Sequence, residues 1–169
     1  MDGKPETTRL FLALWPEPGV RHLLMQWRDA WNWPKGASPV HQDKLHVTLH
    51  FLGALPSERL PELLEGLAVP FTPFRLDLGR ATLWHNGIAV LEPLVQPPEL
   101  PGLHRRLADA LLALGLPPEA RPYRPHVTMA RRAASAIAPQ DGPPVPWSVS
   151  GYALVESRNG MYTVLRDYS

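Results

Sequence analysis

Apolar residues along the chain follow two periodicities in turn, one typical of β-strands and one typical of α-helices. Residues 9–15 (RLFLALW) are apolar at odd and even positions alike, which predicts a strand buried on both faces. Residues 19–31 then carry apolar side chains at intervals of three and four, which predicts an amphipathic helix. Pro16 and Pro18 separate the two segments, because proline rarely continues a strand.

The same kind of alternation continues to the C-terminus. Two more helices are predicted over residues 57–67 and 97–115, the second stopped by Gly115. Gly53 is expected to end the strand that precedes the first of them, and Asn86-Gly87 to form a type I′ hairpin turn. Strands are predicted over residues 44–52, 71–79, 81–85, 88–93, 125–131, 147–157 and 161–168.

Composition bounds the class of protein. The 169 residues suffice for one domain, and 44% hydrophobic with 20% charged residues is typical of an ordinary soluble globule. The net charge of +1 does not indicate a polyanion partner, so any prediction of one must rest on local clusters of basic residues. The lack of cysteine excludes disulfides, thiolate metal sites and cysteine nucleophiles. The first 19 residues lack the features of a signal peptide, and no stretch has the length of a membrane span. We therefore expect a cytoplasmic protein.

One tetrad, His-x-Thr-x, occurs twice, about half a chain apart. It reads HVTL at 46–49 and HVTM at 126–129. A single tetrad of this kind recurs by chance, but two near-identical copies in a chain of seven histidines indicate a shared role. Each half of the chain places a predicted helix before its motif strand. This repetition predicts an α+β fold of two antiparallel sheet lobes that face each other across a cleft.

The strand setting places the polar residues of each tetrad on one face. Residues two apart in a strand project to the same side, so His46 projects with Thr48 and His126 with Thr128. The intervening valines, together with Leu49, Phe51 and Met129, are expected to point into a core. Two such strands that face each other would surround a small volume with two imidazoles and two hydroxyls.

This set of groups suits a phosphodiester. Hydrolysis needs a base that takes a proton from water and an acid that protonates the leaving oxygen, and histidine can fill either role near neutral pH. Threonine hydroxyls can donate hydrogen bonds to the phosphate oxygens, where charge builds in the transition state. The chemistry requires no metal. His50 shares the predicted face of His46, but four strand residues span about 13 Å, too far for both rings to bind one ion. The residues themselves do not distinguish the base from the acid.

Several residues near the second tetrad are further candidates. Arg131 and Arg124 could attract phosphate, although in a straight strand Arg131 would point away from His126; the alternative is a solvated basic edge. Tyr123 lies between two arginines and is a candidate for stacking on a nucleobase. Phe11, Trp15 and Trp33 could also stack on a base, and for the first two core packing is the stronger interpretation.

With both tetrads in place, the chain resembles the two-histidine (2H) phosphoesterase superfamily, and within it the RNA 2′,3′-cyclic phosphodiesterases, also called 2′-5′ RNA ligases. The resemblance spans nearly the whole chain, and the paired tetrads are its specific part. It is supported by RLFLALWP at 9–16, LHVTLHFLG at 45–53, RPYRPHVTMAR at 121–131 and LVESR at 154–158.

The resemblance implies a single bilobed LigT-like domain over 1–169, in which two antiparallel sheets with outer helices are related by a pseudo-two-fold duplication. It implies metal-independent opening of a 2′,3′-cyclic phosphate at an RNA end to leave a 2′-phosphomonoester, with no cofactor. In that reaction His46 would be the proton donor and His126 the proton acceptor. Thr48, Thr128 and Arg131 would bind the phosphate. The expected partner is an RNA or nucleotide 2′,3′-cyclic phosphate end, no membrane or protein partner is implied, and the expected oligomeric state is a monomer.

Three other functions remain open at this stage. The enzyme could act on another cyclic phosphate, such as ADP-ribose 1″,2″-cyclic phosphate, or on a 2′-5′ linkage, where microscopic reversibility also permits ligation. The chain could bind an RNA end without turning it over. A scaffold role would leave the duplicated tetrad unexplained.

Overall fold

The computed structural model describes residues 6–169, so that the predicted domain of 1–169 includes five residues outside the described part. In chain order the elements are β1 (Thr7–Leu14), α1 (Pro18–Asp29), β2 (Ser38–Pro39), the 3₁₀ turn η1 (Gln42–Lys44), β3 (Val47–Pro56), the 3₁₀ turn η2 (Ser57–Arg59), α2 (Leu60–Gly66), β4 (Phe74–Leu83), β5 (Ala89–Pro93), α3 (Glu99–Ala113), β6 (Val127–Arg131), β7 (Val145–Val149), β8 (Tyr152–Arg158) and β9 (Met161–Tyr168).

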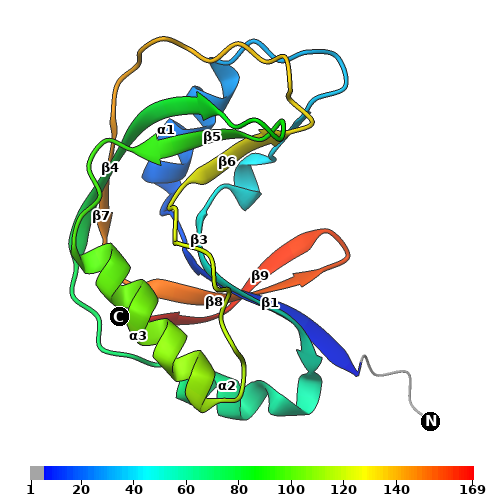
Figure 1. Ribbon diagram of the computed structural model, residues 1–169, viewed down its shortest axis with the longest axis vertical. Coiled ribbons are helices and arrows are strands. Elements are labelled where there is room, and N and C mark those ends of the chain that lie inside the picture. The colour runs from blue at the N-terminus through cyan, green and yellow to red at the C-terminus, as the bar shows by residue number, and fades with distance from the viewer. Residues whose placement is uncertain (1–5) are drawn as a thin grey trace.

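The strands pair antiparallel in the order β7-β4-β5-β6-β3-β1-β8-β9, and β2 also pairs with β6. β3 and β6 are joined at one residue pair only, Val47 with Val127, and Figure 1 shows the sheet changing direction there. We call β1, β3, β8 and β9 with α2 and α3 the lower lobe, and β2, β4, β5, β6 and β7 with α1 the upper lobe. The predicted α+β bilobed fold is confirmed. The two expected sheets are joined edge to edge, because the valine pair continues the hydrogen-bonded ladder from one lobe into the other.

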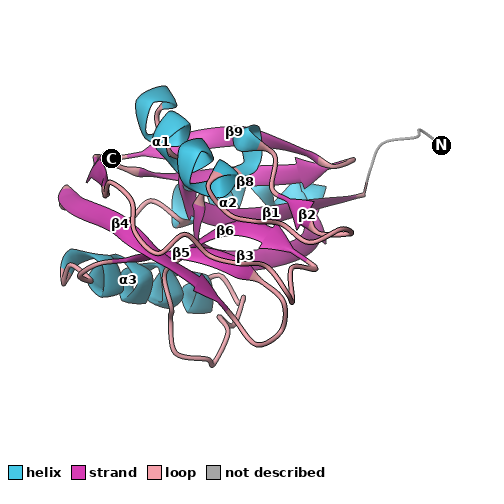
Figure 2. Ribbon diagram, turned by 90° about the horizontal axis from the view of Figure 1, so that it is seen from above, coloured by secondary structure: helices cyan, strands magenta, loops and turns pink. Residues whose placement is uncertain are grey.

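Helices cover the outer faces of the two lobes (Figures 1 and 2). α1 packs against β7 of the upper lobe, and α3 packs against β3 of the lower lobe. The predicted apolar stripe of α3 is buried, and α3 ends as predicted, since Gly115 has a φ of 77° and the Leu116 amide donates to the Leu111 carbonyl. The chain crosses repeatedly between lobes, so each lobe contains segments from both halves of the sequence.

β1 is buried on both faces, as predicted from its continuous apolar run. Leu10, Leu12 and Leu14 belong to the main core on the helix side of the lower lobe. Phe11 and Ala13 form a second cluster with Ala153 and Val155 on the opposite face. This second face is the one that carries the motif residues of β3.

The course of β3 differs from its prediction. Gly53 does not end the strand, which continues to Pro56, because a φ of 80° lets this glycine take part in an irregular stretch without breaking the ladder. The register with β1 shifts twice, so that Ala13 pairs with Thr48 but Phe11 pairs with Phe51. An extra residue in one strand exchanges the faces of all residues beyond it. His50 is therefore buried, opposite Leu12, whereas the Phe51 side chain is 61% exposed. Both predicted orientations were wrong.

Two turns also differ from prediction. In the β4–β5 loop only Gly87 has a positive φ, whereas a type I′ turn needs two consecutive residues in that region. The Gly87 amide donates to the Trp84 carbonyl and the Trp84 amide donates to Ile88, which makes a wider loop. The type I′ pattern instead occurs between β8 and β9, where Asn159 and Gly160 have φ values of 53° and 76°.

The single strand predicted over 147–157 is two strands in different lobes. β7 pairs with β4 in the upper lobe, and β8 pairs with β1 in the lower lobe. The chain crosses at Ser150–Gly151, where a Cβ on Gly151 would lie 2.2 Å from the Tyr168 carbonyl oxygen. Ser150-Gly151 is a dipeptide typical of turns, so the sequence carried a sign of this break, although it did not show that the two strands pair in different lobes.

Candidate active site

The joint between the two lobes brings the two tetrads together. Because Val47 pairs with Val127 in antiparallel orientation, His46 lies across from Thr128 and Thr48 across from His126. The valines are fully buried, and the four polar side chains project from the opposite face and are half-buried. His46 and His126 are diagonal neighbours in this pair, and such residues lie about 7–8 Å apart. The two imidazoles therefore project from neighbouring positions on one face of the sheet.

Each imidazole ring is held by a hydrogen bond from Nδ1 to the carbonyl two residues earlier in the chain. His46 Nδ1 lies 2.6 Å from the Lys44 carbonyl, and His126 Nδ1 lies 2.8 Å from the Arg124 carbonyl. A carbonyl only accepts, so in each ring Nδ1 carries the proton and Nε2 is left with its lone pair. His46 Nε2 lies 2.9 Å from the Thr48 hydroxyl. Each ring thus presents Nε2 as the atom available for proton transfer.

Aromatic rings surround His46. Its ring centroid lies 4.9 Å from that of Phe11, 5.6 Å from that of Trp15 and 5.7 Å from that of Tyr162. These rings remove water from around the imidazole. Burial accordingly lowers the pKa of His46 from 6.5 to about 4, against the opposing effect of the Lys44 carbonyl. The positive charges of Arg21 and Arg131, and that of His126 when its ring is protonated, lower this pKa further.

An ion pair and one indole surround His126. The Trp84 ring lies 4.5 Å from the imidazole, and the guanidinium of Arg124 lies 4.4 Å above that indole. Arg124 is paired with the buried carboxylate of Glu92 at 2.8 and 2.9 Å, and Thr82 donates a hydrogen bond of 2.8 Å to the same carboxylate. The residue whose carbonyl holds His126 is therefore itself anchored by a carboxylate.

The pKa of His126 is also lowered by burial, but here a negative charge acts against the shift. The Arg124 carbonyl and the Glu92 carboxylate raise the pKa, whereas the positive charges of Arg124 and Arg131 lower it. Arg131 thus affects both histidines, which places its exposed guanidinium within electrostatic reach of each ring. It ends β6, and the next residue, Arg132, has a φ of 54°, so the strand bends at this point.

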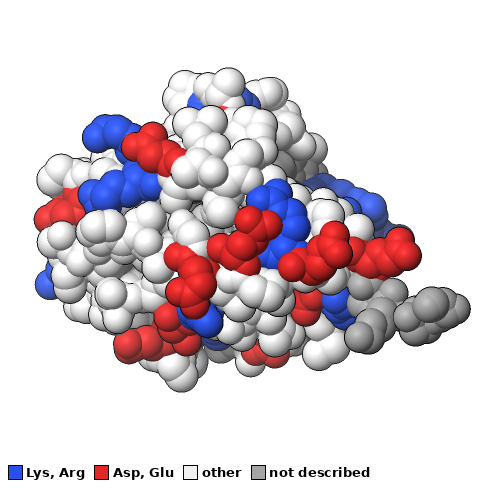
Figure 3. Space-filling view, turned by 90° about the horizontal axis from the view of Figure 1, so that it is seen from below, with Lys and Arg blue, Asp and Glu red and all other residues white. Residues whose placement is uncertain are grey.

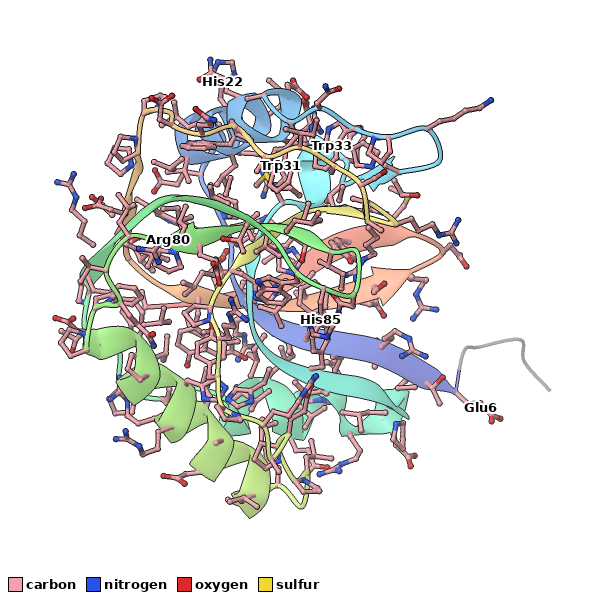
Figure 4. All side chains as sticks on the ribbon, turned by 45° about the horizontal axis from the view of Figure 1, so that its top comes forward. Glu6, His22, Trp31, Trp33, Arg80 and His85 are labelled. Carbon is pink, nitrogen blue, oxygen red and sulfur yellow. The ribbon has the colours of Figure 1, made fainter. Side chains whose placement is uncertain are left out.

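The structure gives the other predicted candidates different surroundings. Arg124 is committed to Glu92 and Trp84, and Phe11 is buried among the rings around His46. The hydroxyl of Tyr123 donates to the Thr48 carbonyl at 2.8 Å, so Tyr123 ties the segment before the second tetrad to the first tetrad. Trp33 is stacked on Trp31 at 5.0 Å beside α1, as Figure 4 shows. The sequence did not indicate any of these contacts, because each joins residues from different segments or depends on how a loop folds.

Two histidines lie behind the first tetrad. His104 stacks on His50 at 3.9 Å and on Tyr123 at 4.0 Å, and His50 Nε2 donates to the His104 carbonyl at 2.9 Å. The prediction that His50 shares the face of His46 was wrong, because the register shift in β3 turns His50 toward α3. Burial lowers the pKa of His104 to about 4.

Sequence reasoning missed three residues at the site. Glu92 carried a signal, because a carboxylate inside the apolar run IAVLEP is rarely buried without a function or partner. Arg21 comes from α1, donates to the Leu45 carbonyl just before the first tetrad, and had no signal. Trp84 had none either, since its contact with His126 depends on how β4 and β5 are placed beside β6.

Within the described residues no group of three or more His, Asp or Glu side chains is arranged to hold a metal ion. In the same range no helix has both the length and the apolar content to cross a membrane.

The chain is similar in sequence to known proteins. Residues 15–160 match the model of the 2′-5′ RNA ligase superfamily. The chain is 36% identical to an RNA 2′,3′-cyclic phosphodiesterase of Thermus thermophilus over 95% of this chain and 89% of the relative. It is 31% identical to the Escherichia coli enzyme of the same name, with 90% and 88% covered.

Solved structures show the same fold. Escherichia coli LigT in complex with 3′-AMP matches with a TM-score of 0.85 at 28% identity, covering 96% of this chain and 97% of that one. The same protein in complex with phosphate matches with a TM-score of 0.80 at 27% identity and the same coverage.

Proposed function

The chain belongs to the 2′-5′ RNA ligase superfamily, and on that premise we propose that it hydrolyses the 2′,3′-cyclic phosphate at RNA ends to a 2′-phosphomonoester. The observation that carries this proposal is the pairing of Val47 with Val127, which places both tetrads on one face at the joint of the lobes. Relatives named RNA 2′,3′-cyclic phosphodiesterase support the same reaction. We further propose that the chain works as one domain over 1–169 and as a cytoplasmic monomer.

In the proposed reaction a water molecule attacks phosphorus while the bond from phosphorus to O3′ breaks. His126 takes the proton of the water through Nε2, and His46 gives a proton to the leaving O3′. Thr48, Thr128 and Arg131 bind the non-bridging oxygens, where negative charge builds. The products are a free 3′-hydroxyl and a 2′-phosphate, so atoms and protons balance without a cofactor.

The surroundings of the two rings support this division of roles. A base becomes positively charged as it accepts the proton, and the Glu92 carboxylate raises the pKa of His126 and so favours that charge. An acid must release its proton readily, and burial among rings near the positive charges of Arg21 and Arg131 gives His46 a low pKa. The negative phosphate would raise the pKa of His46 on binding and so load it with the proton that it then donates.

The test is hydrolysis of an RNA oligonucleotide that ends in a 2′,3′-cyclic phosphate, with ³¹P NMR to distinguish the 2′- from the 3′-monoester. We expect only the 2′-monoester, at a rate that EDTA does not change. His46→Ala and His126→Ala should each lower kcat by about 10²–10⁴-fold, with unchanged melting curves. His22→Ala is the matched control, because this exposed histidine projects outward from α1 (Figure 4). Tight binding of the oligonucleotide without product would show a binding module instead.

A further inference from the structure

An exposed phenylalanine lies on the lower-lobe face that carries the first tetrad. Directly opposed residues of two antiparallel strands project from the same face, and Phe51 lies opposite Phe11 while Thr48 lies opposite Ala13. Phe11 and Ala13 share one face of β1, so Thr48 and Phe51 share it as well. Phe51 is 61% exposed, whereas Phe11 opposite it is buried. The ring is therefore free to contact a ligand on the face that carries the first tetrad.

This ring is continuous with the proposed phosphate site. Phe11 lies between the two, with its ring centroid 4.9 Å from that of His46 and 6.3 Å from that of Phe51. Phe11 itself is buried, so it supports the face without offering a free ring. Of the three neighbouring rings of His46, Phe11 and Phe51, the Phe51 ring is the exposed one.

A cation follows Phe51 on the same face. Arg9 is two residues before Phe11 in β1, so it projects to the same side about 7 Å further along the strand. It is exposed, and among residues 6–169 its guanidinium has no hydrogen bond and no ion pair. Opposite it in β3 is Ala54, which is too small to cover it. Along this face lie Thr48, which is proposed to bind phosphate, then the exposed ring of Phe51, and then the guanidinium of Arg9, which is unpaired within the described residues.

The helix-covered side of the molecule has a different character. Seen from below, basic and acidic side chains are intermixed there (Figure 3). Such a surface has no preference for a polyanion. The arrangement of Phe51 and Arg9 on the β1–β3 face is therefore not repeated on the helix-covered side.

We propose that the single-stranded RNA leading to the cyclic phosphate runs along this β1–β3 face, with a base stacked on Phe51 and a backbone phosphate bound by Arg9. Aromatic rings bind single strands by stacking on bases of any sequence, and cations along the same groove bind the backbone. The proposal rests on the proposed function and sharpens it, since the preferred substrate is then an oligonucleotide end and not a mononucleotide. Phe51 and Arg9 are binding residues and take no part in proton transfer.

The test compares two substrates of the same full-length protein: a tetranucleotide ending in a 2′,3′-cyclic phosphate, and the corresponding mononucleoside 2′,3′-cyclic phosphate. The readout is the ratio of kcat/KM for the tetranucleotide to kcat/KM for the mononucleotide. Phe51→Ala should lower this ratio by about tenfold, as expected for the loss of one base stack. Phe51→Trp should retain it. Arg9→Gln should lower the ratio and reduce the slope of log kcat/KM against log salt for the tetranucleotide by about 0.7.

Two exposed residues of α3, on the far side of the lower lobe, are matched controls. Leu112→Ala removes a large apolar side chain of similar exposure, Arg105→Gln removes an equal charge, and both should leave the ratio unchanged. An unchanged ratio in Phe51→Ala, or equal losses on both substrates, would overturn the proposal. The proposed function fails separately, if the wild-type protein hydrolyses neither substrate.

Discussion

The two motif strands present the same side chains in different settings. Residues 45–50 and 125–130 follow the same order of buried and half-buried positions, and in both copies the imidazole Nδ1 bonds to the carbonyl two residues earlier. Around His46, however, stand three aromatic rings and no carboxylate contributes to its pKa, whereas His126 is supported by Arg124 and the buried Glu92. The orientation of each ring is thus a property of the tetrad, and its proton affinity is a property of the lobe around it.

This difference explains how a duplicated motif can serve two opposite roles. Two identical rings in identical settings would have equal pKa values and no preferred direction of proton transfer. Burial without a compensating carboxylate lowers the pKa of His46 to about 4, while Glu92 limits the lowering at His126. The asymmetry is created by residues outside both tetrads.

The largest loss of activity is expected when both imidazoles are removed. If His46 and His126 act in one proton-transfer sequence, the double variant His46→Ala/His126→Ala should lose little more kcat than either single variant, because either loss already stops the concerted step. Single-turnover kinetics of the three variants measures this. Losses that multiply would show that the two rings act independently.

Next, Glu92→Gln should impair proton transfer by His126 and leave the pKa of His46 unchanged. It removes the charge that raises the pKa of His126 and weakens the anchor of Arg124, so kcat should fall by roughly tenfold. The sign follows from the removed charge: the pKa of His126 moves down, and the acid limb of the kcat profile moves with it to lower pH. NMR titration of the imidazoles measures both rings, and His46 should titrate as in the wild type. If the pKa of His46 shifted as much as the pKa of His126, the two histidines would not be in electrostatically separate surroundings.

The threonines offer a smaller contrast. Thr48 is hydrogen-bonded to His46 Nε2, whereas the hydroxyl of Thr128 has no partner within residues 6–169. Thr48→Val therefore removes support for the imidazole as well as the proposed phosphate contact, and it should lower kcat more than Thr128→Val, by about tenfold against a few-fold. Steady-state kinetics of the two isosteric variants tests this, and equal losses would speak against the extra role of Thr48.

The smallest effect concerns stability in acid. In the unfolded chain His46 takes up a proton near pH 6.5, whereas in the folded protein it stays neutral down to about pH 4. Between these values the unfolded chain binds more protons, so the free energy of unfolding falls as the pH falls from 6.5 toward 4. His46→Gln should reduce this loss, and His126→Gln should reduce it less, because its pKa is lowered less. Urea unfolding at about pH 7 and pH 4.5 gives the comparison.

Much of the fold follows from local patterns. The apolar run of β1, the leucine stripe of α3 and the glycine stop after it all occur where the periodicity predicts them. The errors occur where a strand changes its partner or its register. No local pattern around Leu49 indicates the extra residue that exchanges the faces of His50 and Phe51. Ser150-Gly151 indicates a turn within 147–157, but local sequence does not show that the strands on its two sides pair in different lobes.

The sequence by itself determined that each tetrad would present an imidazole and a hydroxyl on one face of a strand, because side chains in a strand alternate strictly and the valines between them are apolar. Only the tertiary structure decided that the strands meet at Val47 and Val127, that Glu92 stands behind one histidine and aromatic rings around the other, and that Phe51 faces solvent. Local geometry is encoded by neighbours in the chain, whereas proton affinity and the placing of a binding face depend on which distant segments exclude water or supply charge.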